Sequence, residues 1–356
     1  MAGNGKPPLR QSLLFSRLSK RSQPPCRPNP NDAHPLRARR ESDMVWSMTR
    51  RNVLEAIVAA PAVLSAMSAT GAKGKSKIRL GGPVFVKTDD PRELARAHRD
   101  LGYSAAYCPN AKVEDKDHVR AIEEAFKAEG VVIAEVGAWV NLLDPDAEKR
   151  KKNFDYVASR LALAEAVGAI DCVDIAGSYN PTVWYGPHPK NLSKEFLDAT
   201  VENCRKLIDQ VSPKRTKFCI EMMGWSIPDS AENYIKLIKA VDRKQFGVHI
   251  DVCNVINSPE RFYNNGPFIR ETISKLGPWI LSCHAKDLDW KPEMNIHFVE
   301  VIPGRGSVDY RAYLESLAAL GRETPLMLEH LGKAEEYAEG AAYIRKVAKE
   351  AGVEFV

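Results

Sequence analysis

The sequence predicts a (β/α)8 barrel. Two observations indicate this fold class: the number of short apolar runs and the helical pattern of the segments between them. Eight short apolar runs follow one another between residues 78 and 331, and β-branched, aromatic or Cys side chains dominate them. An amphipathic segment with helix start and stop signals lies between one run and the next. Strand and helix alternating eight times over about 275 residues is the size and order of a TIM barrel.

The eight runs have the lengths of buried parallel strands. They cover residues 78–86, 103–108, 131–139, 169–176, 217–223, 246–253, 280–285 and 325–331. An open, doubly wound sheet is the alternative. It usually begins with a Gly-rich phosphate loop, and Leu80-Gly81-Gly82-Pro83 does not match that motif.

The helices between the runs have recognisable ends. Asp90-Pro91 begins a helix that ends at Gly102, and Asp229-Ser230 begins another. Glycine readily adopts the left-handed conformation that closes a helix. We therefore expect further helices to end near Gly130, Gly168, Gly277, Gly321 and Gly352.

The chain divides into three parts. Residues 1–47 are rich in Arg, Pro, Ser and Asn, which predicts a disordered basic tail. If translation starts at Met44 or Met48, most or all of this tail is not part of the protein. Residues 48–76 contain Arg50-Arg51 before a mildly apolar stretch, which resembles a twin-arginine export signal and predicts a periplasmic protein. An amphipathic helix of a cytoplasmic protein is the alternative. Residues 77–356 form the predicted barrel.

Charge and hydropathy exclude several classes of function. The net charge is +5, but residues 1–51 hold 11 Lys and Arg against 3 Asp and Glu, which leaves 40 against 43 in the remainder. The body therefore lacks the basic character that nucleic-acid binding favours. The sequence has no uninterrupted apolar run of about 18 residues, so we expect no stable membrane insertion after processing. The seven cysteines lack the density of a disulfide scaffold.

Four polar residues interrupt the last four apolar runs. They are Glu221, Asp251, His284 and Glu329. The active site of such a barrel lies at the carboxyl ends of its strands, and buried charges are costly unless they are paired or bind a cation. Three carboxylates and one imidazole suit Mn²⁺, Co²⁺, Mg²⁺ or Zn²⁺. We therefore predict that these four residues bind one divalent metal ion.

These residues and their neighbours resemble the xylose-isomerase-like TIM barrels of the sugar phosphate isomerase/epimerase superfamily, especially the ketose 3-epimerases. The matching segments are 220–222, 249–251, 284–287, 303–306 with 309–310, and 328–330. The resemblance implies one divalent metal held by the four residues, with Glu221 and Glu329 as the acid and base. It also implies proton abstraction beside a sugar carbonyl through an enediolate, and related barrels are often dimers or tetramers.

One departure from the family leaves the reaction open. Many of the epimerases have a second His three residues after the strand-six Asp, where this chain has Asn254, and a further Glu that some carry is replaced by Ile227. Asn cannot carry a proton at neutral pH. A lyase or dehydratase acting on a keto-sugar, keto-inositol or 3-keto-glycoside is therefore the alternative to an isomerase or epimerase.

We expect a small carbohydrate substrate and name its candidate contacts. They are Trp139, His188, Trp225, His249, Asn254, Lys286 and Arg305, with Glu135 as a weaker candidate. His249 is also a candidate support beneath Asp251, and His330 is expected to point away from the barrel interior. A DNA-repair endonuclease on the same barrel would need more His ligands and a basic surface. A non-catalytic sugar-binding barrel would not need both Glu221 and Glu329.

Overall fold

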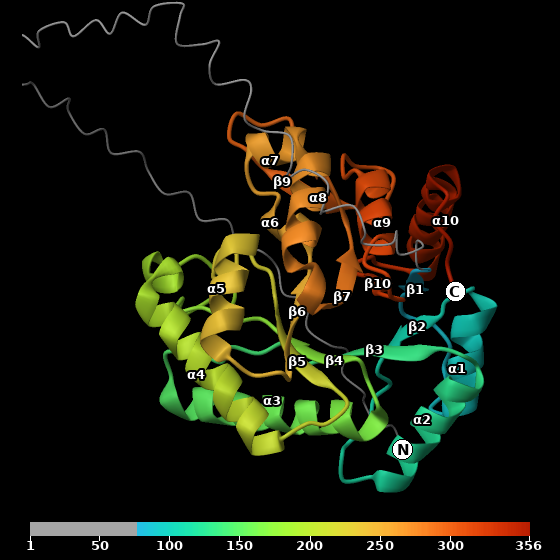
Figure 1. The fold of residues 1–356 in the computed structure, drawn as a ribbon, viewed down its shortest axis with the longest axis horizontal. Coiled ribbons are helices and arrows are strands. Elements are labelled where there is room, and N and C mark those ends of the chain that lie inside the picture. Colours follow the sequence, from blue (N-terminus) through green and yellow to red (C-terminus); the bar gives the residue numbers. More distant parts are fainter. Residues whose placement is uncertain (1–76) are drawn as a thin grey trace, which may run out of the picture. The chain divides into compact units, whose positions relative to one another are not determined.

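The computed structural model describes residues 77–356, and in it eight parallel strands close into a barrel. Around the barrel the strands follow the order β1, β10, β7, β6, β5, β4, β3, β2 (Figure 1). They are β1 (Arg79–Gly81), β2 (Ala105–Tyr107), β3 (Val132–Gly137), β4 (Asp171–Asp174), β5 (Lys217–Glu221), β6 (Phe246–Ile250), β7 (Ile280–Ala285) and β10 (Pro325–Leu328). The predicted barrel is confirmed and the open sheet is excluded. The predicted tail at 1–47 and signal at 48–76 lie outside the described residues.

Eight main helices surround the strands (Figure 1). They are α1 (Pro91–Asp100), α2 (Lys116–Ala128), α3 (Ala147–Val167), α4 (Lys194–Val211), α5 (Ala231–Val241), α8 (Asn265–Leu276), α9 (Tyr310–Ala318) and α10 (Ala334–Ala351). From α1 to α10 each packs against the next in this series. The series buries a shared apolar layer against the outer face of the strands.

The predicted helix ends are mostly correct. Asp90 caps α1 by accepting hydrogen bonds from Arg92 N and Glu93 N, and Ser230 caps α5 in the same way from Asn233 N. Gly168 closes α3 in the left-handed conformation at φ 73°. α8 ends at Leu276, next to Gly277 as expected, but Gly277 does not adopt the left-handed conformation. Its φ is −41°, because the chain continues directly into the 3₁₀ helix η2 (Gly277–Trp279).

Two small side chains and one methionine form a separate apolar cluster in the barrel. Ala105, Ala134 and Met327 are fully buried and pack together there. A side chain on Gly81 would meet Met327 Sδ and Ala105 O, each at 2.5 Å, so glycine is required for this close approach. Among the polar side chains, Glu221 and His284 lie at or near the carboxyl ends of their strands.

A hairpin that the sequence did not predict follows β7. It consists of β8 (Asp287–Trp290) and β9 (Phe298–Val301), which pair antiparallel outside the barrel sheet. The short elements α6 (Val252–Val255), α7 (Pro259–Tyr263) and η1 (Pro189–Leu192) lie in the other loops at the carboxyl ends of strands. Among residues 77–356, no helix has both the length and the apolar character needed to span a bilayer.

Candidate metal centre and substrate pocket

The four predicted metal ligands come together at one end of the barrel. Glu221 is the last residue of β5 and His284 lies near the end of β7, while Asp251 and Glu329 directly follow β6 and β10. These four strands are consecutive neighbours in the barrel. One potential ligand atom from each residue lies within 4.8 Å of the others. We call these four residues the upper cluster.

The geometry of the upper cluster is centred on one imidazole nitrogen. His284 Nδ1 lies 2.9 Å from Glu221 Oε1, 3.0 Å from Glu329 Oε2 and 3.5 Å from Asp251 Oδ2. The His284 side chain is fully buried, and the Glu329 side chain is 17% exposed. The oxygen and nitrogen donors therefore surround a small volume that opens on the side of Glu329.

Local structure fixes the orientation of two of these carboxylates. Asp251 caps α6, and its Oδ1 accepts hydrogen bonds from Cys253 N and Asn254 N, which directs Oδ2 toward the cluster. Asn254 Nδ2 donates to Glu221 Oε1 at 3.2 Å. Asn254, which stands where many epimerases have a His, thus holds a carboxylate of the cluster in place.

Lys286 lies two residues after His284 and points into the same centre. Its Nζ is 2.9 Å from both Asp251 Oδ2 and Glu329 Oε2, and the residue is only 3% exposed. Burial opposes protonation of Lys286, but Asp251 and Glu329 raise its pKa above the usual range. The site therefore contains a fixed ammonium group beside the carboxylates.

The electrostatics favour charged forms in most of the upper cluster. Burial acts against the ionised form of Asp251, but Lys286 and His284 hold its pKa well below the usual range, and His284 does the same for Glu329. Burial raises the pKa of Glu221 to about 7, against the influence of His284. One ammonium group thus faces three carboxylates, and this hard to borderline O/N donor set fits a divalent cation.

A second polar cluster lies deeper in the barrel, directly beneath the first. It comprises Glu135, Asp171, His249 and Ser282, all at most 1% exposed, and we call it the lower cluster. Ser282 Oγ donates to Asp171 Oδ2 at 2.6 Å and lies 2.7 Å from His249 Nδ1. Because the single hydroxyl proton is donated to Asp171, His249 Nδ1–H donates to Ser282 Oγ.

Two irregularities in strand pairing bring the lower cluster together. Between β2 and β3 the register passes from Ala106–Ile133 to Tyr107–Glu135, which skips one residue and places Glu135 opposite Tyr107. Between β6 and β7 it passes from Val248–Ile280 to His249–Ser282. Such bulges reverse the side-chain alternation and re-aim side chains next to active sites. The first irregularity places Glu135 next to the inward-facing Ala134, and the second places Ser282 opposite His249.

The lower cluster contacts the upper one through His284. Glu135 Oε2 lies 3.3 Å from His284 Nε2, on the opposite side of the ring from Nδ1. The His249 ring packs edge-on against His284 at 4.1 Å between centroids, and His249 Nε2 has no hydrogen-bond partner among the described residues. Glu135 is therefore placed to orient the His284 ring, as carboxylates commonly do for histidines that bind a metal.

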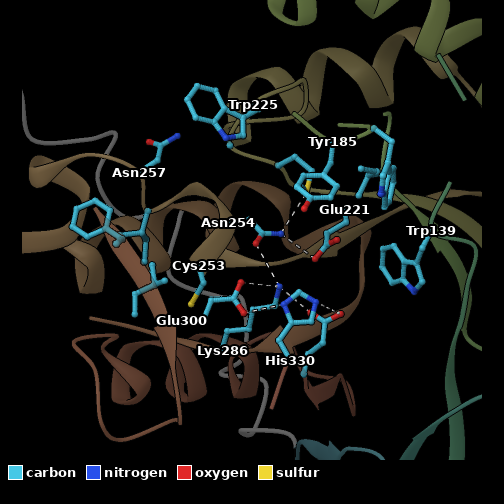
Figure 2. A pocket seen from close by; sticks show the side chains of 18 of the residues that line it. Trp139, Tyr185, Glu221, Trp225, Cys253, Asn254, Asn257, Lys286, Glu300 and His330 are labelled. Carbon is cyan, nitrogen blue, oxygen red and sulfur yellow. Dashed lines mark hydrogen bonds and ion pairs between the residues drawn. The ribbon is translucent and has the colours of Figure 1, made fainter. Parts of the chain in front are cut away.

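A cavity of about 1020 Å³ opens above the upper cluster. Figure 2 shows Glu221, Lys286 and His330 near its centre, with Trp139, Tyr185 and Trp225 around them. Aromatic faces of this kind pack against the apolar faces of sugar rings. The cavity combines a polar end at the upper cluster with extensive apolar walls.

The structure brings some predicted substrate contacts to this cavity and not others. Trp139, Trp225, Asn254 and Lys286 line it. His249 lies below it in the lower cluster. The other two lie elsewhere. His188 accepts a hydrogen bond from Lys190 N at the start of η1, and Arg305 pairs with Glu339 of α10 at 2.7 Å. A substrate role for His188 and Arg305 stays a prediction that this placement does not support.

The expectation for His330 was wrong. It lines the cavity, and its Nδ1 lies 2.9 Å from Glu300 Oε2 while its Nε2 lies 3.4 Å from Glu329 Oε1. His330 has φ 59°, a left-handed conformation that reverses the direction expected from strand alternation. Glu300 also lines the cavity and carried no sequence signal, because no strand was expected in residues 287–301.

Asp287 organises the loop 303–306, which carried part of the family resemblance. Its Oδ2 accepts hydrogen bonds from Gly304 N and Gly306 N, and its Oδ1 accepts from Val308 N and Leu288 N. A side chain at Gly306 would meet Asp287 Oδ1 at 2.4 Å. This part of the motif therefore supports the loop beside the site rather than the substrate.

The comparisons agree with this fold. The family model for the xylose isomerase-like TIM barrel matches residues 95–347. A search of curated proteins finds no match. Several solved structures share the fold. One is a xylose isomerase-like TIM barrel protein from Mycobacterium smegmatis in complex with magnesium, with 20% identity over 73% of this chain and 88% of that chain and a TM-score of 0.55.

Two other similar structures are epimerases. D-psicose 3-epimerase from Clostridium cellulolyticum, solved with D-tagatose, has 16% identity over 78% of this chain and 100% of that chain and a TM-score of 0.56. The 3-keto-D-glucoside 4-epimerase from E. coli has 15% identity over 76% of this chain and 100% of that chain and a TM-score of 0.54. At these identities the likeness shows the fold. With the family match over residues 95–347, it follows that the chain belongs to the xylose isomerase-like TIM barrel family.

Proposed function

We propose that this protein is a divalent-metal-dependent isomerase or epimerase that moves a proton beside the carbonyl of a sugar. The observation that carries the proposal is the convergence of Glu221, Asp251, His284 and Glu329 within 4.8 Å, at the base of a cavity that Glu221 and Glu329 line. A bound divalent ion would polarise the substrate carbonyl and stabilise the enediolate that forms when the proton leaves.

Glu221 and Glu329 are the proposed acid and base. They project from β5 and β10, which stand on either side of β6 and β7 in the barrel order. The two carboxylates therefore approach the cavity from opposite sides. One removes the proton from the carbon beside the carbonyl, and the other returns a proton from the opposite face, which inverts that carbon.

Lys286 and Asn254 position the substrate and the carboxylates. The Lys286 ammonium group lies beside Asp251 and Glu329 and lines the cavity, so it donates hydrogen bonds to a substrate oxygen held there. Asn254 keeps Glu221 Oε1 oriented through its Nδ2 donor. Neither role requires Asn254 to transfer a proton.

Elimination is the second candidate reaction, and the size of the cavity favours it. An enediolate can expel a leaving group from the next carbon without any change in the residues that remove the first proton. A cavity of about 1020 Å³ has room for both a sugar and a departing group. The two reactions differ in their products, since elimination gives an unsaturated ketone and a released alcohol.

Solvent-deuterium exchange tests the proposal. The full chain, loaded in turn with Mn²⁺, Mg²⁺, Co²⁺ or Zn²⁺, is incubated in D2O with D-fructose, D-psicose and methyl 3-keto-β-D-glucoside. We expect deuterium at the carbon beside the carbonyl of at least one compound, with the rate reduced more than about 100-fold in Glu329→Gln. Glu339→Gln, a surface glutamate outside the cavity, is the matched control. Absence of exchange and of elimination with all four metals contradicts the proposal.

We further propose that residues 48–76 direct export, so that the enzyme meets glycosides and free sugars rather than phosphorylated metabolites. Cell fractionation of bacteria expressing the full chain tests this. We expect periplasmic protein that becomes cytoplasmic when Arg50 and Arg51 are both replaced by Lys. Equal distribution of the two forms contradicts export through this signal.

A further inference from the structure

The candidate active-site cavity is much larger than a single sugar requires. Its volume of about 1020 Å³ lies at the upper end of the range for pockets that bury drug-sized ligands. The metal-binding cluster occupies its base, while Ile256, Ile296 and Phe298 contribute apolar surface to its walls. A monosaccharide bound at the metal would leave much of this apolar surface uncovered.

The apolar wall continues onto the β8–β9 hairpin. A second cavity of about 260 Å³ lies between the hairpin and α7, and Ile296 and Phe298 line both cavities. Phe298 stacks on Phe262 with 4.8 Å between ring centroids, which fixes the ring that the two cavities share. The two cavities are therefore neighbouring parts of one apolar region that begins at the candidate active site.

The far end of this region is unusually exposed. Trp290 is 58%, Ile296 60%, Tyr263 80% and Met294 fully exposed, and all four line the second cavity. Single exposed apolar side chains are normal, but a group of this size beside a cavity marks a binding surface. Its position next to the sugar-binding end indicates that the occupant is attached to the sugar.

The charges of the main cavity restrict the chemistry of that occupant. The carboxylates of Glu221, Glu300 and Glu329 line it, with Lys286 as the single Lys or Arg among its lining residues. Lys286 is already paired with Asp251 and Glu329. This surplus of carboxylates repels a phosphate group. A neutral, apolar substituent suits the walls better than a phosphorylated one.

We propose that the β8–β9 hairpin and α7 form a subsite for the aglycone of a glycoside, and that the substrate is a keto-glycoside with an aromatic or other apolar aglycone. This inference rests on the proposed function for the sugar end of the site. The aglycone lies against Ile296 and Phe298 and extends toward Trp290 and Met294, while the sugar carbonyl faces the upper cluster.

Binding of unreactive glucosides tests the subsite. Isothermal titration calorimetry on the full, Mn²⁺-loaded chain compares phenyl β-D-glucoside with methyl β-D-glucoside. We expect about tenfold tighter binding of the phenyl compound from the additional apolar burial. Ile296→Ser removes most of this preference, because it weakens binding of the phenyl compound more than binding of the methyl compound. Leu101→Ser, at an exposed apolar residue after α1, preserves the preference as the matched control.

Three results would overturn the inference: equal affinity for the two glucosides, a preference that survives Ile296→Ser, or no binding of either. A fourth result that would overturn it comes from sedimentation velocity. A wild-type dimer that becomes a monomer in Met294→Asp would show that a second copy of the chain covers the patch. Deuterium exchange separates this inference from the proposed function, because exchange into methyl 3-keto-β-D-glucoside without a phenyl preference refutes the subsite alone.

Discussion

The two polar clusters inside the barrel contain similar residue types but keep them in different charge states. In the upper cluster, neighbouring charges lower the pKa of Asp251 and Glu329 despite burial, and they raise that of His284. In the lower cluster, burial raises the pKa of Glu135 and Asp171. Burial similarly lowers the pKa of His249.

Access and charge balance explain this difference. Glu221 and Glu329 line the large cavity, whereas the residues of the lower cluster lie beneath it. Burial alone drives carboxylates and imidazoles toward neutral forms, and Ser282 connects two of them by hydrogen bonds. Metal ligands must be deprotonated and need an entry path. In the upper cluster Asp251 and Glu329 are ionised and the cavity gives an entry path, so an ion that binds there has only to displace the protons of His284 and Glu221. In the lower cluster burial keeps the carboxylates protonated and the described residues leave no such path, so we assign it a supporting role.

The largest expected effect comes from removing a ligand of the upper cluster. Glu221→Ala and His284→Ala should each weaken binding of the divalent ion by more than about 100-fold. Metal analysis after dialysis, followed by competitive titration against a chelator, measures this loss. Asp171→Asn is the matched control from the lower cluster, and it should retain about one ion per chain. Loss of the ion in Asp171→Asn alone would reverse the assignment of the two clusters.

An intermediate effect is expected at Glu135, where the two clusters meet. Glu135→Leu removes the acceptor beside His284 Nε2 and should weaken metal binding by about 10–100-fold. Glu135→Gln keeps an acceptor and should restore affinity to within a few-fold. Nitrogen NMR of the His284 ring provides a second readout, since the Leu variant should lose the single tautomer. Equal affinities in the Leu and Gln variants would refute the orienting role.

A smaller effect on stability is expected within the lower cluster. Ser282→Ala leaves Asp171 Oδ2 and His249 Nδ1 without their partner and should lower the free energy of unfolding by about 1–3 kcal/mol. Urea unfolding of the full chain in chelator measures this. Ser159→Ala, at an exposed helix position, should change it by less than about 0.5 kcal/mol. A Ser282→Ala variant with normal stability that fails to bind the metal ion would show that the lower cluster acts on the ion directly.

The smallest effect is expected at a charge outside both clusters. Arg305 pairs with Glu339 on the surface, with side chains 60% and 45% exposed. Arg305→Ala should therefore change the free energy of unfolding by less than about 1 kcal/mol. The KM for any substrate found by deuterium exchange should stay within about twofold, because Arg305 does not line the cavity. A large increase in KM would instead establish the substrate contact that the sequence predicted.

The sequence predicted the upper cluster because its signals are local. Glu221, Asp251, His284 and Glu329 each end an apolar run, and parallel strands in a barrel bring such ends to one rim. β7 matches its predicted run exactly in extent, at 280–285. The other predicted apolar runs are longer than the strands of the structure, because apolar residues also occupy the loop positions next to the strands.

The lower cluster and the substrate walls could not be predicted in the same way. Glu135 and His249 were named from the sequence only as single candidates, and their grouping with Asp171 and Ser282 depends on strand pairing, including two irregularities of register, between segments that are distant in sequence. The β8–β9 hairpin lies outside the repeating strand and helix pattern, so Glu300 and Phe298 carried no signal. His330 faces the cavity because of its left-handed backbone, which alternation does not reveal.

Anomalous diffraction from crystals of the full chain soaked in Mn²⁺ tests the central claim most directly. We expect one strong peak within direct coordination distance of His284 Nδ1 and of oxygens of Glu221, Asp251 and Glu329. The lower cluster offers competing positions, among Asp171, Cys219 and His249 or among Glu135, His249 and His284. A peak at either of these positions, or none in the barrel, would contradict the account.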